Sequence, residues 1–444
     1  MARPLAFVSA CLLALPAQAW EASARLEAEA RWFYQLEQGA LAPSAAATVE
    51  IFHGWNDGED RLVGEFFGRV DEQDDARTHA DVREFYVQSI GTEFEAAAGL
   101  RRLFWGVTES RHLVDIINQS DLVEDLDAEQ KLGQPMLNAT LIRPWATLDL
   151  ILMPYQRART FPGPQGHPRL PFPVAADEAR YQSPRAQHHL DGALRLRHSS
   201  GGLDLGLAYF NGTAREPMIL PCLRRGSGFQ GTEDQANCDI FSGIIVPQSP
   251  LPEDFTPLLQ ALGLAPSDAE VEAQIREEVL RNIVLVPLYQ RLRQYSLDAQ
   301  YVTGGWALKL EAVARELGGE HSVATVSGFE YSLGDITGRG WDIGLLAEYL
   351  YDQRRDLLSR RFDHDVFLGT RVSLNDVAGT LVLAGFLFDE SGDDHLLQIE
   401  ASRRLGDAWR LSGKFRLFEK TGDDPFTGFL ADEDMLSLSL ERFF

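Results

Sequence analysis

The chain has 444 residues, 45% of them hydrophobic, and its 66 acidic residues outnumber its 41 lysines and arginines to give a formal net charge of -25. This charge argues against a nucleic-acid-binding protein, because such proteins need a basic face. No run of 18 apolar residues follows the first 19 residues, which excludes a transmembrane helix. A membrane-spanning β-barrel is still compatible with the sequence, since helices and closed barrels both satisfy their backbone polar groups in lipid.

Residues 1–19 have the three parts of a secretory signal peptide. Arg3 supplies the basic start, Leu5 to Leu15 form the apolar centre, and Ala17-Gln18-Ala19 is a cleavage site of the A-x-A type. We predict cleavage after Ala19, so that residues 20–444 form the mature, exported protein.

The exported part shows the two-residue alternation of β-strands. Ala24, Leu26 and Ala28 share one face of the first strand, and Ile343 and Leu345 share one face of a later strand. We predict an all-β fold, a single transmembrane antiparallel β-barrel of about 18 strands (16–18). The expected strands are residues 22–36, 45–54, 61–71, 80–90, 92–105, 136–143, 145–153, 187–198, 201–211, 287–302, 304–316, 321–333, 340–352, 362–374, 378–389, 394–405, 408–419 and 432–444.

The connections between these strands sort by length. Counted along the chain, the even-numbered connections are short, and the three longest, near residues 106–135, 154–186 and 212–286, are odd-numbered. An outer-membrane barrel has short turns on the periplasmic side and long loops outside. The sorting therefore favours such a barrel over a soluble β-sandwich.

One residue conflicts with the alternating pattern. Arg102 lies on the lipid-facing side of the predicted strand 92–105, where an arginine at the membrane midplane costs about 2–4 kcal/mol. Either Arg102 lies near an interface, or a bulge changes the register of this strand.

The last strand ends on an aromatic carboxyl terminus. Leu436, Leu438, Leu440 and Phe444 fall on one face of it, because successive side chains of a strand point to opposite faces. This pattern resembles the final strand of bacterial outer-membrane β-barrels. The resemblance implies the outer membrane of a Gram-negative bacterium, contact with outer-membrane lipid, and recognition of this strand by the barrel-assembly machinery.

The longest loop, residues 212–286, contains both cysteines that remain after signal cleavage. Cys222 and Cys238 predict one disulfide, as is usual in an exported protein. Further along, Ser267-Asp-Ala-Glu270 is a capping box, and Val271 and Ile275 follow at helical spacing. We predict a short helix there, acting as a lid over the mouth, a surface decoration or a plug.

If the apolar faces contact lipid, the opposite faces line the lumen. The predicted pore-lining residues are Arg195, Arg197, Lys309, Arg315, Arg371, Arg404, Arg410, Lys414, Arg416, Glu311, Glu348 and Glu400. Arg410, Lys414 and Arg416 share one face beside Arg404, and such a confined cluster would bind or conduct anions. The alternative is that each base pairs with an acid of a neighbouring strand, such as Glu400.

Segment 106–135 is one of the odd-numbered connections, which lie on the external side of the predicted barrel. It nevertheless carries apolar residues such as Leu113, Ile116 and Ile117. These side chains would not remain exposed to water. We predict that the segment folds inward and constricts the barrel, with packing beneath neighbouring loops as the alternative. The polar residues that it would bring to the constriction are Glu109, Arg111, His112, Asp115, Asn118, Asp121, Glu124 and Asp125.

Four short motifs carry a narrower resemblance. They are Phe104-Trp-Gly-Val-Thr-Glu109, Asp115-Ile-Ile-Asn-Gln119, Lys131-Leu-Gly-Gln-Pro135 and Thr160-Phe-Pro-Gly163. They resemble a family of uncharacterised proteobacterial outer-membrane proteins that is loosely similar to alginate-export and other porin-like barrels. That resemblance implies an eighteen-stranded barrel with a basic constriction. It concerns architecture, so alginate itself is not implied as the solute.

The sequence therefore predicts a porin-like channel rather than an enzyme, for passive diffusion or export of a small or polymeric solute, with anions among the candidates. One alternative is a closed structural or binding barrel whose loops bind a partner. Another is a barrel hydrolase that uses histidines such as His112, His167 or the pair His188-His189. Because no nucleophile motif, metal-ligand spacing or cofactor fingerprint occurs, we expect no metal and no cofactor.

Overall fold

The structure, a computed structural model, describes residues 20–36, 40–168, 170, 172–224, 236–238, 281–354, 364–389, 394–420, 430 and 432–444. The predicted signal peptide and the predicted loop helix at 267–279 lie outside these residues. Among the described residues, no helix is long and apolar enough to cross a membrane. The described helical turns are three short 3-10 turns, η1 (Asn56–Gly58), η2 (Ala176–Glu178) and η3 (Ala186–His188).

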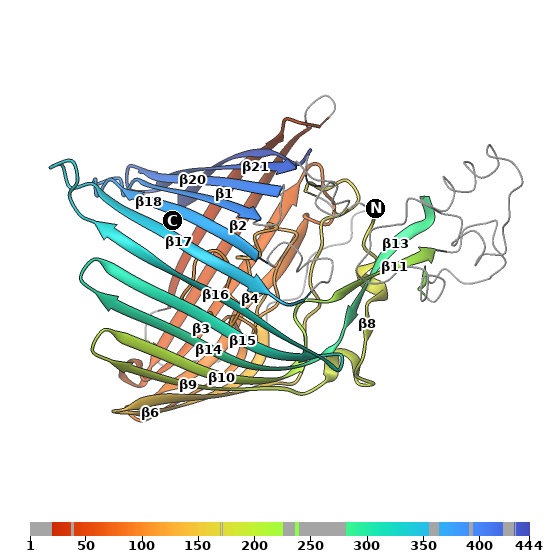
Figure 1. Cartoon of the computed structure of the whole chain (residues 1–444), viewed down its shortest axis with the longest axis horizontal. Coiled ribbons are helices and arrows are strands. Elements are labelled where there is room, and N and C mark those ends of the chain that lie inside the picture. Colours follow the sequence, from red (N-terminus) through yellow and green to blue (C-terminus); the bar gives the residue numbers. More distant parts are fainter. Residues whose placement is uncertain are drawn as a thin grey trace, which may run out of the picture.

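Eighteen antiparallel strands form one closed barrel (Figure 1). The strands are β1 (Glu21–Phe33), β2 (Ala40–Trp55), β3 (Asp60–Asp71), β4 (His79–Ile90), β5 (Phe94–Arg101), β6 (Gln134–Arg143), β7 (Ala146–Met153), β9 (Asp191–Ser200), β10 (Leu203–Thr213), β14 (Arg291–Thr303), β15 (Trp306–Leu317), β16 (Glu320–Leu333), β17 (Asp342–Asp352), β18 (His364–Ser373), β19 (Leu381–Asp389), β20 (Asp394–Leu405), β21 (Trp409–Lys420) and β22 (Met435–Phe443). Closure is made by β1, which pairs with β2 on one side and with β22 on the other. The predicted all-β barrel is confirmed, and each strand overlaps its predicted range.

The two ends of the barrel differ in the length of their connections. Short turns such as 144–145, 201–202 and 304–305 lie at one end, and the long connections 102–133, 154–190 and 214–290 belong to the other. The odd-numbered connection 318–319 has only two residues, because Gly318 and Gly319 adopt positive φ angles of 60° and 97° that permit a tight hairpin.

The outer surface of the barrel is apolar. On β15, Trp306 and Leu308 are exposed, while Lys309 and Glu311, which follow them on the opposite face, are buried, as expected for alternating lipid-facing and inward-facing residues. Aromatic side chains mark the short-turn end of the strands. They are Trp306, Trp341, Trp409, Phe443 and Phe444. This is the architecture of outer-membrane barrels, which confirms the predicted porin-like fold and its place in a Gram-negative outer membrane.

Strand β5 ends at Arg101, earlier than predicted. Gly99 has a φ of 137°, and a Cβ at this position would lie 2.3 Å from the carbonyl oxygen of Phe85. The chain then leaves the wall, and the backbone N–H of Arg102 donates to Glu84 at 2.8 Å while its guanidinium contacts Glu65. The expected conflict disappears because Arg102 is not part of a lipid-facing strand.

A small second sheet stands beyond the long-loop end (Figure 1). Its strands are β8 (Arg180–Tyr181), β11 (Met218–Arg224), β12 (Ala236–Asn237) and β13 (Ile283–Tyr289). The predicted disulfide between Cys222 and Cys238 is confirmed and joins β11 to the end of β12. Both cysteines are buried, so the bridge is part of the core of this sheet.

Candidate functional site

The connection 102–133, called here the inner segment, lies against inward-facing side chains of the barrel wall. Its first anchor is Glu311 of β15, which is fully buried. The Glu311 carboxylate accepts hydrogen bonds from the backbone N–H groups of Val107 at 2.7 Å and Val114 at 3.1 Å. A buried carboxylate is tolerated where several donors satisfy it, so Glu311 fixes one turn of the inner segment.

Glu348 of β17 is the second anchor. It accepts hydrogen bonds from the backbone N–H groups of Glu109 at 2.9 Å and Ser110 at 2.8 Å. Asn118 closes the base of the segment, because its side chain bonds the backbone of Leu103 at 2.8 Å and of Leu132 at 2.9 Å. Glu311 and Glu348, both predicted to line the pore, therefore bind backbone N–H groups of the inner segment.

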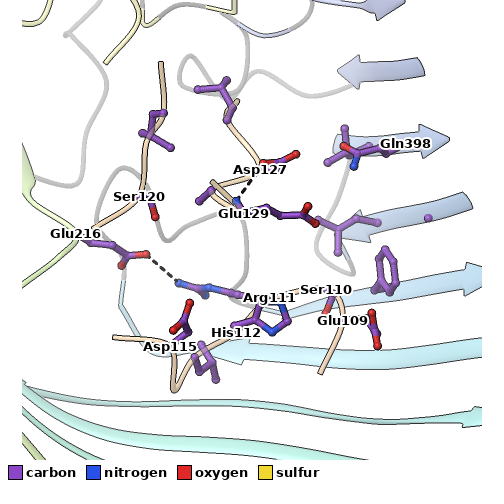
Figure 2. A pocket seen from close by; sticks show the side chains of 18 of the residues that line it. Glu109, Ser110, Arg111, His112, Asp115, Ser120, Asp127, Glu129, Glu216 and Gln398 are labelled. Carbon is purple, nitrogen blue, oxygen red and sulfur yellow. Dashed lines mark hydrogen bonds and ion pairs between the residues drawn. The ribbon is translucent and has the colours of Figure 1, made fainter. Parts of the chain in front are cut away.

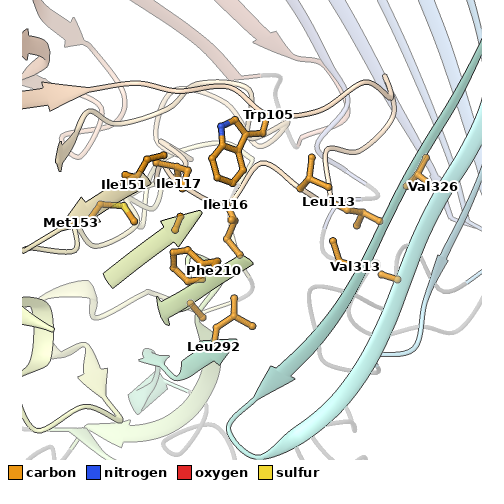
Figure 3. Close-up of a cluster of buried hydrophobic side chains, with 14 of the residues drawn as sticks. Trp105, Leu113, Ile116, Ile117, Ile151, Met153, Phe210, Leu292, Val313 and Val326 are labelled. Atoms are coloured by element: carbon orange, nitrogen blue, oxygen red, sulfur yellow. The ribbon is translucent and has the colours of Figure 1, made fainter. Parts of the chain in front are cut away.

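Apolar packing fills the lumen on one side of the barrel (Figure 3). The inner segment contributes Leu113, Val114, Ile116 and Ile117, of which Val114 and Ile117 are fully buried. The wall contributes inward-facing side chains of β7, β10, β14, β15 and β16. They are Ile151, Phe210, Leu292, Val313 and Val326. Apolar contact on both surfaces removes water from this half of the interior.

Ion pairs hold the inner segment on the opposite side. Asp125 lies 2.7 Å from the guanidinium of Arg416 and 2.9 Å from the ammonium group of Lys414, both on β21. Glu124 lies 3.0 Å from the guanidinium of Arg69 on β3. Lys414 also contacts Glu400 of the neighbouring strand at 2.9 Å. The cluster predicted as an anion path is therefore compensated by carboxylates of the inner segment and of β20.

Six further predicted wall residues are also paired with carboxylates. Arg195 contacts Asp298 at 2.9 Å, Arg197 contacts Asp149 at 3.2 Å, and Lys309 contacts Glu109 at 2.9 Å. Arg315 contacts Asp352 at 3.5 Å, Arg371 contacts Glu330 at 3.2 Å, and Arg410 contacts Glu441 at 3.7 Å. Arg404 is exposed and lies opposite Arg410 in the strand register. Of these six contacts, Arg197 with Asp149 and Arg410 with Glu441 join adjacent strands, as in the alternative pairing network. Three others span an intervening strand, and the contact of Lys309 is with the inner segment.

Other predicted residues of the inner segment have local roles. Asp115 lies 3.2 Å from Lys131, Asp121 lies 3.6 Å from Arg83, and the ring of His112 meets Phe104 edge-on at 4.7 Å between centroids. Among the described residues, no group of three side chains is arranged to hold a metal ion. Ser183 lies 3.2 Å from Nδ1 of His189 at the long-loop end, but no carboxylate contacts His189 in the part of the chain that the structure describes.

Two cavities border residues 124–130. The loop-side cavity, of about 520 Å³, is lined by Leu126, Asp127, Ala128 and Glu129 and by residues of the long loops such as Arg159 and Glu216. The turn-side cavity, of about 630 Å³, is lined by Glu124, Asp125 and Gln130 and by Arg25 and Glu441 near the short turns. Leu383 and Glu400 line both cavities, so the two spaces approach each other at β19 and β20.

The loop-side cavity is rich in charged groups (Figure 2). The guanidinium of Arg111 points toward Glu216, 4.0 Å away, and lies 3.1 Å from Asp352. Although burial alone would raise the pKa of Glu216, the guanidiniums of Arg354 and Arg111 hold it well below its usual value. The pKa of Glu129 is shifted upward instead, because burial and the charges of Asp127 and Glu400 raise it to about 7.

Sequence reasoning missed several of these residues. Arg159 directly precedes the Thr160-Phe-Pro-Gly163 motif, which was a usable signal, whereas Glu216 and Asp352 had none. Their importance comes from a cavity that forms between segments far apart in the chain.

The fold is similar to those of known porins at low sequence identity. Among solved structures, OpdQ of Pseudomonas aeruginosa aligns with 96% of this chain and 98% of its own at 9% identity and a TM-score of 0.49. OccD3 (OpdP) of the same organism aligns with 96% of this chain and 91% of its own at 9% identity and a TM-score of 0.48. No protein-family model and no curated protein matches the sequence. At this level of similarity, no solute and no residue role can be transferred.

Proposed function

We propose that the chain is an outer-membrane channel through which small solutes diffuse passively, with the inner segment as its constriction. The observation that supports this proposal is the pair of cavities that both border residues 124–130 and have Leu383 and Glu400 in common. A solute would pass from one cavity to the other along β19 and β20, beside residues 124–130.

A small solute fits this lumen better than a polymer. The inner segment packs against the wall from Ile151 to Val326 and is fixed by Glu311 and Glu348. These contacts leave room for passage on the β18 to β21 side. The ion pairs of Lys414 and Arg416 lower their attraction for a passing anion, since each charge already has a carboxylate partner.

Planar-bilayer recording of the refolded mature chain tests the proposal. Discrete current steps are expected in symmetric potassium chloride, and the reversal potential in a salt gradient gives the ion preference. Absence of current from protein that is independently shown to be folded would contradict the channel and favour the closed binding barrel. The variant Arg143→Gln, at an exposed turn pair with Glu93, is a matched control that removes one positive charge far from both cavities.

A further inference from the structure

His79 is the first residue of β4 and lies opposite Arg69 in the register of β3 and β4. Its Nδ1 lies 3.1 Å from the carbonyl oxygen of Arg77. A carbonyl oxygen only accepts hydrogen bonds, so Nδ1 is the nitrogen that carries a proton and donates this bond. In a neutral ring the other nitrogen, Nε2, would then have a lone pair and no proton.

The surroundings of Nε2 do not suit a lone pair. Nε2 lies 3.6 Å from Oε1 of Glu124 and 4.0 Å from Oδ2 of Asp121, both in the inner segment. All three atoms are buried, and none of them has a hydrogen-bond partner among the described residues. A lone pair beside two carboxylate oxygens is repulsive, and buried polar atoms without partners are costly. A proton on Nε2 would convert this repulsion into attraction to both carboxylates.

The charges around His79 point to the same protonation state. Among the described residues, successive contacts of 4.0 Å or less connect His79 to five carboxylates and four guanidiniums. The carboxylates are those of Glu27, Glu29, Asp71, Asp121 and Glu124, and the guanidiniums are those of Arg31, Arg69, Arg77 and Arg83. With a neutral His79 one negative charge has no counter-charge in this network. An imidazolium balances the network, which matters because uncompensated charge is costly in a buried site.

We propose that His79 carries a proton on each ring nitrogen in the folded barrel and is a positioning residue for the constriction. The imidazolium holds Asp121 and Glu124 together against β4, where the chain enters residues 124–130 that border both cavities. Each of the two acids also contacts an arginine of the wall, so the imidazolium joins two separate attachments into one. The proposal rests on the proposed channel function for its effect on current, but the protonation state is measured without any current.

The first test is nitrogen-15 NMR of the mature chain in detergent, labelled at its 10 histidines. The spectrum is recorded at pH 8, where a free imidazole is mostly neutral. We expect a ring with both nitrogens protonated, whose signal is lost in His79→Gln protein. His167 lies 2.9 Å from Glu433 and is the other histidine to examine, so His167→Gln protein is the matched comparison. Absence of any doubly protonated ring from the unaltered chain would overturn the proposal without the need for a variant, as would a signal lost only in His167→Gln protein.

A second-site substitution separates the charge of His79 from its packing. His79→Gln should lower the midpoint of thermal unfolding, because two buried carboxylates lose their shared counter-charge. Adding Asp121→Asn should restore part of this loss, since it removes one of the two negative charges and supplies an amide donor. His321→Gln, at an exposed position of β16, is the control for loss of a histidine and should leave the midpoint unchanged. A folded double variant that is no more stable than His79→Gln would overturn the charge role.

Planar-bilayer recording tests the positioning of the constriction. The open-channel current of His79→Gln should be noisier than that of the unaltered chain, and the current of the double variant should lie between the two. A doubly protonated His79 together with an unchanged current in folded His79→Gln protein would contradict the positioning role.

The failure of the channel and the failure of the His79 proposal give different results. A doubly protonated His79 in a chain that gives no current would contradict the proposed channel and retain the protonation state. Current from a chain whose His79 is neutral would retain the channel and contradict the proposal.

Discussion

The two halves of the barrel interior hold the inner segment by different physical means. Near β7 and β14 to β16 the contact is apolar and closed to water, with Ile117 and Val326 almost fully buried. Near β3 and β21 it consists of ion pairs, such as Glu124 with Arg69 and Asp125 with Arg416. Apolar contact is insensitive to salt and pH, whereas ion pairs beside water respond to both. In the proposed channel, the apolar half would therefore fix the constriction, and the charged half would set its ion preference.

The apolar half is tested most severely by placing a charge in it. Ile117→Asp buries a carboxylate without a partner, which should lower the free energy of unfolding by about 3–5 kcal/mol. If the barrel still closes, the inner segment should detach and single-channel conductance should increase severalfold. Val377→Asp, in an exposed turn, is the control for an added carboxylate. Wild-type conductance in folded Ile117→Asp protein would contradict a constriction fixed by apolar packing.

Glu311 tests the polar anchor within the apolar half. Glu311→Gln keeps one acceptor oxygen and loses the charge, so its bonds to Val107 and Val114 weaken. We expect a loss of about 1–3 kcal/mol in the free energy of unfolding and a noisier open-channel current. Glu316→Gln, on the same strand in an exposed pair with Arg293, should change neither. Identical thermal unfolding of the two variants would show that Glu311 is not an anchor.

These anchors also show where prediction from sequence stops. Strand positions follow from alternation and turn residues, which are local, and all eighteen strands were predicted for this reason. Glu311 was expected to line the pore because it alternates with apolar residues, and it does face inward. Its partners Val107 and Val114 lie about 200 residues away in a segment without periodicity. No repeat in the sequence could assign that contact.

The inner segment was easier to predict than the contacts that it makes. Apolar residues in an external loop must be buried, and this argument needs no partner. The compensation of Lys414 by Asp125 was missed, because the ion pair joins residues 289 positions apart. A cluster of bases read from one strand alone is therefore a weak predictor of an anion path.

The charged half is tested at Asp125. Asp125→Asn removes one counter-charge from Lys414 and Arg416, and the lost ion-pair bonds should cost about 1.5–3 kcal/mol. The reversal potential in a potassium chloride gradient should shift toward anion preference. Asp57→Asn in the exposed turn η1 should leave it unchanged. A shift toward cations, or none, would contradict the view that this pair sets the ion preference.

The smallest expected effect is a pH dependence from Glu129. Burial, with Asp127 and Glu400, raises its pKa to about 7, so the carboxyl is mostly neutral at pH 6 and mostly charged at pH 8. Asp125, Asp127, Glu400 and Lys414 are the other charged groups that act on this position. The added negative charge above pH 7 should increase the preference for cations, because it lies beside the passage between the two cavities.

Reversal potentials of the unaltered chain and of Glu129→Gln at pH 6 and pH 8 measure this effect. The difference between the two pH values should be present in the unaltered chain and absent in the variant, and at pH 6 the two proteins should agree. An equal difference in both would place the titrating group elsewhere, and Asp127, whose pKa is also raised by burial and by Asp125, would be the next to substitute. The described core residues of the apolar half, such as Ile117 and Val326, do not titrate, so the contribution of this half to conductance should remain constant over the same pH range.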